Sequence, residues 1–282
     1  MQEVLDAQQG DLAKMGFQRL TSTATSVYKF FDKTLSIGEM EVRKLRHDPT
    51  ELLTRAVQPA LWLLVFGEVL SSVRVIPTGN LSYMAFMAPG ILAQSVLFIA
   101  IFYGIAVIWE RDLGIIHKFL VSPTPREVLV LGKALSAGVR ALSQLVIVYA
   151  LTLIVGVSIN WNPLNLLLVM VAVILGSSLF STFSLIIASL VKTRERFMGI
   201  GQILTMPLFF ASNAIYPISM MPTWLQVISR INPLTYEVDA LRGLMIVGGT
   251  SMYGVGFDLL VLFCGMVALV LIGSKLYSKV VT

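Results

Sequence analysis

The chain of 282 residues contains one cysteine and two histidines, and this scarcity excludes several kinds of site. The one thiol, Cys264, cannot form an internal disulfide, and its place within a long apolar stretch predicts a packing role. His47 and His117 are far apart in the sequence and have no cysteine or acidic cluster at the spacing of metal ligands. We therefore expect no disulfide and no metal site.

Charged residues are also few, at 13% of the chain, whereas 56% of the residues are hydrophobic and the mean hydropathy is +0.81. A soluble domain typically has about 25% charged residues. The net charge of +5 comes from Lys and Arg beside apolar stretches, where anionic lipid headgroups explain it better than nucleic acid does. The composition predicts a membrane protein that contacts lipid and binds no nucleic acid.

The sequence also lacks a catalytic constellation. No apolar stretch contains a histidine that could serve as the base for a serine nucleophile. Gly132-Lys133 is followed by Ala134 and lacks the upstream glycine of a phosphate-binding loop. We predict that the chain is not an enzyme and that it binds no cofactor itself.

What the chain has instead is long apolar stretches. A helix rises about 1.5 Å per residue, so about 20 apolar residues cross a hydrocarbon core of about 30 Å. Residues 48–282 are predicted to form an all-α membrane domain with six transmembrane helices. These helices are expected at about residues 56–73, 83–109, 134–157, 164–190, 198–218 and 257–274.

Lys and Arg follow an alternating pattern along these stretches. They concentrate before the first stretch, in the second and fourth gaps and in the tail, whereas the remaining gaps carry few or balanced charges. Because cytoplasmic loops carry the excess of basic residues, this pattern predicts six spans with both termini in the cytoplasm.

Residues 1–47 form a predicted cytoplasmic leader. From Val27 to Leu45, apolar residues recur every three or four positions among several Lys and Arg. This spacing is typical of an amphipathic helix that lies in the membrane interface, and a soluble docking helix is the alternative.

The gap before the last stretch, residues 217–256, holds two short segments that are too short and too polar to cross the membrane alone. Asn232-Pro233 places an N-cap residue before a proline at the first helical position. Irregular backbone cannot face lipid, so we predict re-entrant or surface-lying helices on the external side.

The second gap carries the most informative polar cluster. Glu110, Arg111 and Asp112 end one span, Gly114 follows, and the apolar side chains up to Phe119 alternate with His117 and Lys118. This pattern predicts a short amphipathic helix held between two spans, where a partner could push. An ordinary interfacial loop is the alternative interpretation.

Several motifs resemble the permease subunit of type-2 ABC transporters, especially the subset similar to daunorubicin-resistance exporters. The resemblance covers about residues 40–280 and depends on two blocks in the right order. The first runs from Ala88-Pro-Gly through Glu110-Arg-Asp-Leu-Gly and Leu120-Val-Ser-Pro-Thr-Pro-Arg to Gly132-Lys133, and the second is Asn232-Pro-Leu-Thr-Tyr-Glu-Val-Asp-Ala-Leu-Arg-Gly-Leu. Asp112 stands where the family pattern has Glu, which keeps the charge.

The resemblance implies a dimer of permeases, identical or related, driven by two separate ATP-binding-cassette subunits that hold ATP and Mg. It also implies a prokaryotic plasma membrane as the location. The ATPase is expected to contact a coupling segment with Glu110, Arg111, Asp112, Gly114, His117 and Phe119. The external re-entrant segment is expected to include Pro217, Asn232, Pro233, Tyr236, Asp239 and Arg242.

Polar residues within the spans are candidates for a solute path or for helix packing, because they are costly in lipid. These candidates are Glu68, Gln94, Ser177, Ser181, Ser184 and Asn213. The span centres have no fixed charge, which favours an amphipathic or lipid-like cargo such as a hydrophobic drug, a lipid or a lipid-linked glycan.

Two other classes remain as alternatives. A secondary transporter or channel that acts alone would have an inverted repeat and charges near the midplane. An intramembrane enzyme would need paired acids or a histidine cluster in adjacent spans, and the sequence has neither. An exporter permease is the preferred hypothesis.

Overall fold

The computed structural model describes residues 49–73, 76–79, 81–113, 126–191 and 193–276. Within these ranges the chain is helical and forms no strand, apart from an isolated antiparallel bridge between Ile159 and Ile246. The predicted leader, together with Gly114, His117 and Phe119 of the second gap, lies outside the described residues.

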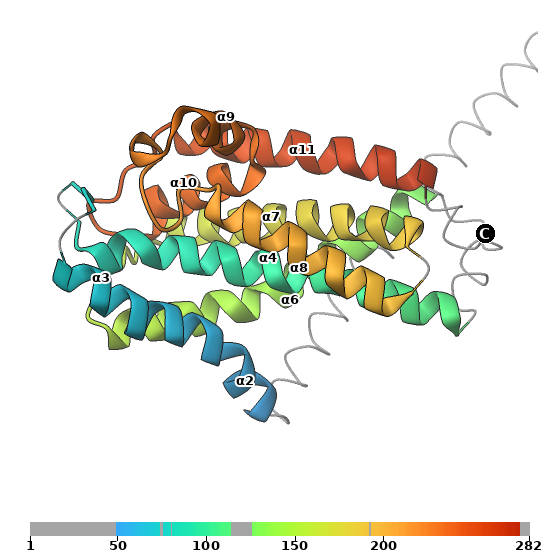
Figure 1. Cartoon of the computed structure of the whole chain (residues 1–282), viewed down its shortest axis with the longest axis horizontal. Helices are drawn as coiled ribbons and strands as arrows, with labels where there is room; N and C mark the ends of the chain where they lie inside the picture. The colour runs from blue at the N-terminus through green and yellow to red at the C-terminus, as the bar shows by residue number, and fades with distance from the viewer. Residues whose placement is uncertain (1–48, 74–75, 80, 114–125, 192, 277–282) are drawn as a thin grey trace, which may run out of the picture.

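Four helices are long and apolar enough to cross a membrane, judged by length and composition. They are α4 (Tyr83–Asp112), α6 (Arg126–Ile154), α7 (Pro163–Leu190) and α11 (Val255–Leu276). Figure 1 shows that they run alongside one another as a bundle. Each contains one of the predicted stretches for most of its length, and α7 begins as expected, because the Asn162 side chain accepts from the Leu164 amide at 3.0 Å.

The other two predicted stretches form shorter helices. The first stretch consists of α2 (Pro49–Ala60), a π-helical segment η1 (Leu61–Gly67) and α3 (Glu68–Val73), which follow one another directly. Its apolar part is Ala56–Ser72, which is shorter than a full span. Among the described residues, four of the six predicted spans are helices long and apolar enough to cross. The other two spans remain predictions.

The fifth stretch ends earlier than the sequence predicts. Helix α8 (Arg194–Phe210) stops at Phe210, and the chain turns over residues 211–216 rather than continuing to residue 218. The Ser212 hydroxyl donates to the Phe209 carbonyl at 2.7 Å, and the Tyr216 hydroxyl donates to the Phe210 carbonyl at 2.7 Å. These side chains satisfy carbonyl groups that a longer helix would have paired.

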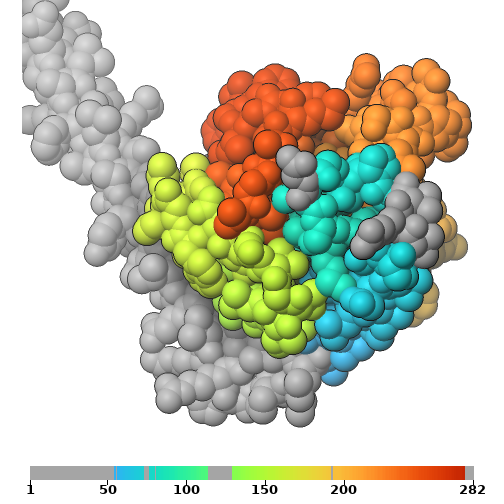
Figure 2. All heavy atoms as spheres, turned by 90° about the vertical axis from the view of Figure 1, so that its left-hand side faces the viewer, coloured from blue at the N-terminus to red at the C-terminus, as the bar shows by residue number. Residues whose placement is uncertain are grey.

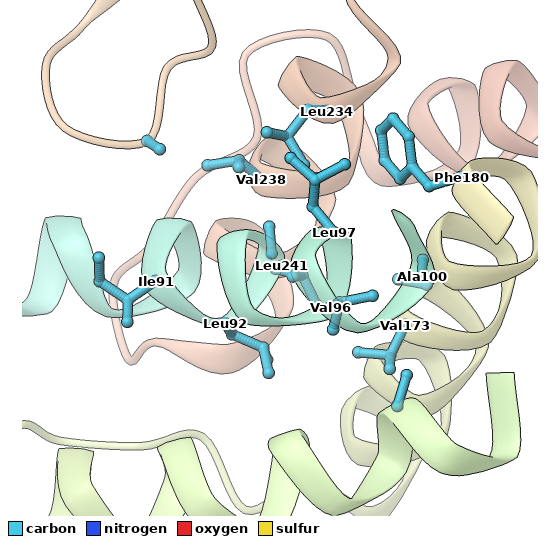
Figure 3. Close-up of a cluster of buried hydrophobic side chains, with 14 of the residues drawn as sticks. Ile91, Leu92, Val96, Leu97, Ala100, Val173, Phe180, Leu234, Val238 and Leu241 are labelled. Carbon is cyan, nitrogen blue, oxygen red and sulfur yellow. The ribbon is translucent and has the colours of Figure 1, made fainter. Parts of the chain in front are cut away.

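Helix α7 lies at the centre of the bundle and packs against α4, α6, α10 (Pro233–Met245) and α11. Most of the side chains buried between α4, α7 and α10 are apolar. Figure 3 shows Leu97, Val173 and Phe180 near Leu234 and Leu241 in this cluster, and all five are buried. Burial of such side chains against protein stabilises the arrangement in the same way as in a soluble core.

The gap before α11 forms the two predicted short helices, α9 (Thr223–Ile231) and α10, and in addition a single turn, η2 (Ile218–Met220). Asn232 caps α10, since its Oδ1 accepts from the Leu234 amide at 3.0 Å. Figure 2 shows the end of the bundle near these segments, with the orange region that contains α9 at its periphery. Helix α9 exposes Trp224, at 65%, whereas α10 is buried among the long helices.

Candidate functional site

One end of the bundle carries a charged cluster, which we call the charged end and define by Glu110, Asp112, Lys133 and Arg194. Lys133 on α6 pairs with Glu110 on α4. Arg194, the first residue of α8, pairs with Asp112 at 2.8 Å. The last turn of α4 is thus joined to α6, about two turns after its first residue, and to the beginning of α8.

A further pair of contacts reinforces the charged end. The Arg111 guanidinium donates to the Val191 carbonyl at 3.1 Å, at the end of α7. The Arg194 guanidinium lies over the Trp109 ring, with its Cζ 3.5 Å from the ring centroid. A cation above an indole face is attracted by the ring quadrupole, in addition to its ion pair. Four helices therefore meet where the chain leaves α4 toward residues 114–125.

Within the predicted external segment, Arg242 attaches α10 to the rest of the bundle. Arg242 is buried, and its guanidinium donates to the Asn213 carbonyl at 2.6 Å and to the Phe86 carbonyl at 3.3 Å. With its amide oxygen turned toward Arg242, the Asn213 side chain lies 3.3 Å from that guanidinium. Two predicted residues are thereby brought together, and they fasten α10 to α4 and to the turn after α8.

Asp239 organises the loop between α10 and α11. Its Oδ2 accepts from the Met252 amide at 2.7 Å and from the Tyr253 amide at 3.0 Å. The Ser251 hydroxyl lies 2.9 Å from Asp239 and 2.8 Å from Asp258. A hydroxyl has one hydrogen to donate, so it can serve only one carboxylate at a time. Asp239 already accepts from two backbone amides, which favours its ionised form. We infer that Asp258 carries a proton and donates it to the Ser251 oxygen, while the Ser251 hydroxyl donates to Asp239.

The remaining predicted residues of the external segment have more peripheral places. Tyr236 is half-buried, donates to the Arg230 carbonyl at 2.6 Å and lies in an aromatic group with Tyr253 and Phe257. Pro217 and Pro233 are also half-buried; Pro217 directly precedes η2, and Pro233 is the first residue of α10. Prolines at these positions lack only an amide hydrogen that would have no partner in the helix.

The serines predicted on one face of α7 are all buried. Ser184 donates to the Ile101 carbonyl on α4, and a side chain at Gly104 would collide with it. Ser181 donates to the Ser178 carbonyl within its own helix at 3.2 Å. These contacts are typical of close helix packing, in which small polar residues let two backbones approach. The third serine, Ser177, has no partner among the described residues.

Two further path candidates differ in their surroundings. Glu68 is exposed at the first position of α3, which lies near the beginning of α4, the end opposite Glu110. Gln94 is buried in α4, and its Nε2 has no described hydrogen-bond partner. Cys264, which was expected to pack, is exposed on α11, because that face of the helix has no described neighbour to cover it.

Sequence reasoning missed Glu237. This carboxyl group is fully buried on α10, a helix outside the four long ones, and burial raises its pKa well above the ordinary value. Its spacing from Leu234 and Leu241, three and four positions, could have placed it on the buried face of the helix. Lys133 and Arg194, the partners of the predicted acids, were counted only as orientation signals.

Helical spans of this length, a buried polar network and a charged end together define a polytopic membrane protein whose described residues contain no group of metal-ligating side chains. The profile of the ABC-2 type transporter family matches residues 33–246, which is most of the chain. The chain belongs to this family of ABC transporter permeases.

Named relatives agree with this assignment. The transport permease ycf38 of Cyanophora paradoxa is 28% identical over 80% of this chain and 78% of its own length. The daunorubicin resistance ABC transporter permease protein DrrB1 of Streptomyces coeruleorubidus is 26% identical over 79% of this chain and 77% of its own. The inner membrane transport permease YadH of Escherichia coli K12 is 25% identical over 68% and 73%, respectively.

Proposed function

We propose that the chain is the transmembrane subunit of an ABC exporter that moves an amphipathic drug, a lipid or a lipid-linked glycan. Family membership supports the permease role, and the relative named for daunorubicin resistance supports an amphipathic cargo. The observation that carries the proposal is the charged end, where α4, α6, α7 and α8 are connected beside the segment expected to meet the ATPase.

The proposed assembly has two ATP-binding-cassette subunits, which hold ATP and Mg, and a second permease copy, identical or related. The ATPases dock on the segment from Glu110 to Phe119. Both termini and the charged end face the cytoplasm, and the α9–α10 pair is a re-entrant element on the outer side. The proposed location is the plasma membrane of a prokaryote, with six spans that include the α2–η1–α3 segment and α8.

Transport is proposed to begin when ATP closes the two ATPases and displaces the coupling segment. That displacement reaches α6 through Glu110 and Lys133, and it reaches α8 through Asp112 and Arg194. Because several helices are connected at this end, they tilt together rather than one at a time. The tilt shifts the population toward a state that is open to the outside.

The decisive experiment is purification of the chain with its candidate ATPase, followed by assays in lipid. ATP-dependent uptake of daunorubicin and of a fluorescent phospholipid into inside-out vesicles would distinguish a drug from a lipid as cargo. We expect uptake of at least one probe only when both subunits and Mg·ATP are present. Full transport without any ATPase would instead indicate the alternative, a stand-alone transporter or channel.

Charge reversal tests the coupling role of the charged end. Glu110→Lys and Lys133→Glu should each lower the number of cargo molecules moved per ATP hydrolysed, and the double swap should restore it, because the pair is rebuilt. Exchange of the charges of Glu110 and Arg111 should also uncouple hydrolysis from transport. Glu195→Lys is the matched control, since Glu195 is exposed in the first turn of α8 and forms no described ion pair. Unchanged coupling in all the Glu110 variants would contradict the assignment.

A further inference from the structure

Among the buried side chains whose polar atoms have no described partner, three come from α4, α7 and α10. They are the Nε2 of Gln94 on α4, the Oγ of Ser177 on α7 and both carboxyl oxygens of Glu237 on α10. Their side chains are exposed by 1%, 0% and 0%, respectively. Buried polar groups are nearly always hydrogen-bonded, so a set of unpartnered atoms calls for an explanation.

Gln94 and Glu237 lie at the same level of the bundle. At one end of α10, Arg242 stacks on Phe86 of α4, with 3.8 Å between the guanidinium carbon and the ring centroid. At the other end, Leu234 lies beside Leu97 of α4 (Figure 3). Glu237 lies between these two contacts on α10, and Gln94 lies between them on α4.

Ser177 lies at this level as well. Helices α4 and α7 run in the same direction, because α6 between them reverses the chain. Ser184 on α7 donates to the Ile101 carbonyl on α4. Ser177 precedes Ser184 by two helical turns, and Gln94 precedes Ile101 by the same two turns.

Helix α10 completes the convergence at Gly176. The Glu237 carboxyl group occupies the space that a Cβ at Gly176 would take, next in sequence to Ser177. Val173 and Phe180, which flank this pair by one turn on either side, belong to the same apolar cluster as Leu234 (Figure 3). The lack of a side chain at Gly176 is what allows a carboxyl group to enter the contact between α7 and α10.

No described cation neutralises Glu237. The nearby guanidinium of Arg242 is directed to the backbone carbonyls of Phe86 and Asn213. An ionised carboxylate buried without a partner is strongly unfavourable, so the group is neutral. A carboxylic acid, a primary amide and a hydroxyl group present both donors and acceptors, yet they are not bonded to one another directly.

We propose that Gln94, Ser177 and Glu237 form an internal water-binding site between α4, α7 and α10, in which Glu237 is a carboxylic acid that donates its proton to a bound water. Buried waters typically make about three hydrogen bonds to otherwise unsatisfied groups, and these three side chains can supply them. The site lies within one protomer and needs no partner chain. It gives α10 a polar attachment to the long helices that the apolar cluster alone would lack.

Infrared spectroscopy of the full chain in lipid tests the state of Glu237. The wild-type protein should have a protonated carboxyl band that is missing in Glu237→Gln and that shifts in D2O, because the acid proton exchanges through the water. Glu237→Gln keeps the size and the hydrogen-bonding capacity, so folding is retained. Asp258, which is inferred to be protonated as well, should contribute an acid component that stays in both proteins. Acid bands that lose no component in Glu237→Gln would overturn the proposal.

A density map that resolves water tests the ligand. We expect density within hydrogen-bond distance of all three side chains in the wild type and its loss in a Gln94→Leu, Ser177→Ala double variant. Gly176→Ala should displace the Glu237 carboxyl group and remove both the density and the D2O-sensitive band, whereas Gly199→Ala, a helical glycine with open space around it, should leave both unchanged. Direct bonds among the three side chains with no intervening density, or a coordinated cation there, would refute the water site.

Discussion

The guanidinium of Arg242 stacks over the ring of Phe86, with its Cζ 3.8 Å from the ring centroid, and also donates to the carbonyl of the same residue. One side chain of α10 thus contacts both the ring and the backbone of α4. This contact lies near the beginning of α4, at the opposite end of that helix from Glu110. It fastens the short helix α10 to a helix long enough to cross the membrane.

Replacement of Arg242 by lysine should weaken this attachment although the charge is kept. An ammonium group lacks the planar fork that stacks on a ring and serves two carbonyl groups together. We expect a loss of about 1–2 kcal/mol in the free energy of unfolding. The measurement is the thermal midpoint in detergent, with Arg196→Lys as the control, because Arg196 is exposed at the beginning of α8. Equal midpoints for the two variants would contradict the stacking role.

Asp239 on α10 and Asp258 on α11, which both contact the loop between these helices, should respond differently to replacement by asparagine. Asp239 accepts from two backbone amides, so Asp239→Asn turns an acceptor into a partial donor and should destabilise the protein by about 1–3 kcal/mol. Asp258 is inferred to be protonated, so Asp258→Asn keeps a donor toward Ser251 and should change stability by less than about 1 kcal/mol. Thermal unfolding of both variants at neutral pH measures the difference. A reversed order would show that the proton belongs to Asp239.

Gly90 allows α4 to approach the turn after α8. A Cβ at this position would lie 2.6 Å from the Ala214 carbonyl oxygen and 2.7 Å from its Cα, and backbone atoms cannot rotate away. Gly90→Ala should therefore cost about 1–3 kcal/mol through overpacking. Gly199→Ala, which meets nothing within 4 Å, should instead be neutral or stabilising by up to about 1 kcal/mol, as expected for a helical glycine. Comparison of the two thermal midpoints decides the question.

Arg194 combines an ion pair and a stack in one side chain. Arg194→Lys keeps the charge near Asp112 but loses the planar contact with Trp109. We expect greater access of acrylamide to Trp109, measured by fluorescence quenching in a variant whose other tryptophans are replaced by phenylalanine. Arg196→Lys in the same background should leave quenching unchanged. The same quenching in both variants would mean that Arg194 does not cover the ring.

The local signals of the sequence predicted most of the helices. Asn162-Pro163 and Asn232-Pro233 begin α7 and α10 as expected, because an N-cap and a proline act within one turn. The end of α8 could not be predicted in this way. The residues after Phe210 contain no glycine or proline up to Tyr216, but the chain turns there and buries Ala214 against Gly90, a contact about 120 positions away in the sequence.

The candidate site was predicted in part for a similar reason. Glu110 and Asp112 were recognisable from their place at the end of a span, whereas their partners Lys133 and Arg194 come from other helices and depend on the tertiary packing. Glu237 could be placed on a helix face, but its lack of a partner is a property of three helices together. Pairings between distant segments are what a single sequence does not specify.

Helix α4 connects Asp112, which pairs with Arg194, to Phe86, on whose ring Arg242 stacks. With 30 residues it is about 45 Å long, so a tilt of about 5° about its midpoint would shift each end by about 2 Å. A shift of that size exceeds the range over which a hydrogen bond or a ring stack survives. If the two ends of α4 lie on opposite sides of the bilayer, as proposed, a small push at the charged end would be sufficient to loosen α10 on the other side, without a separate signal between them.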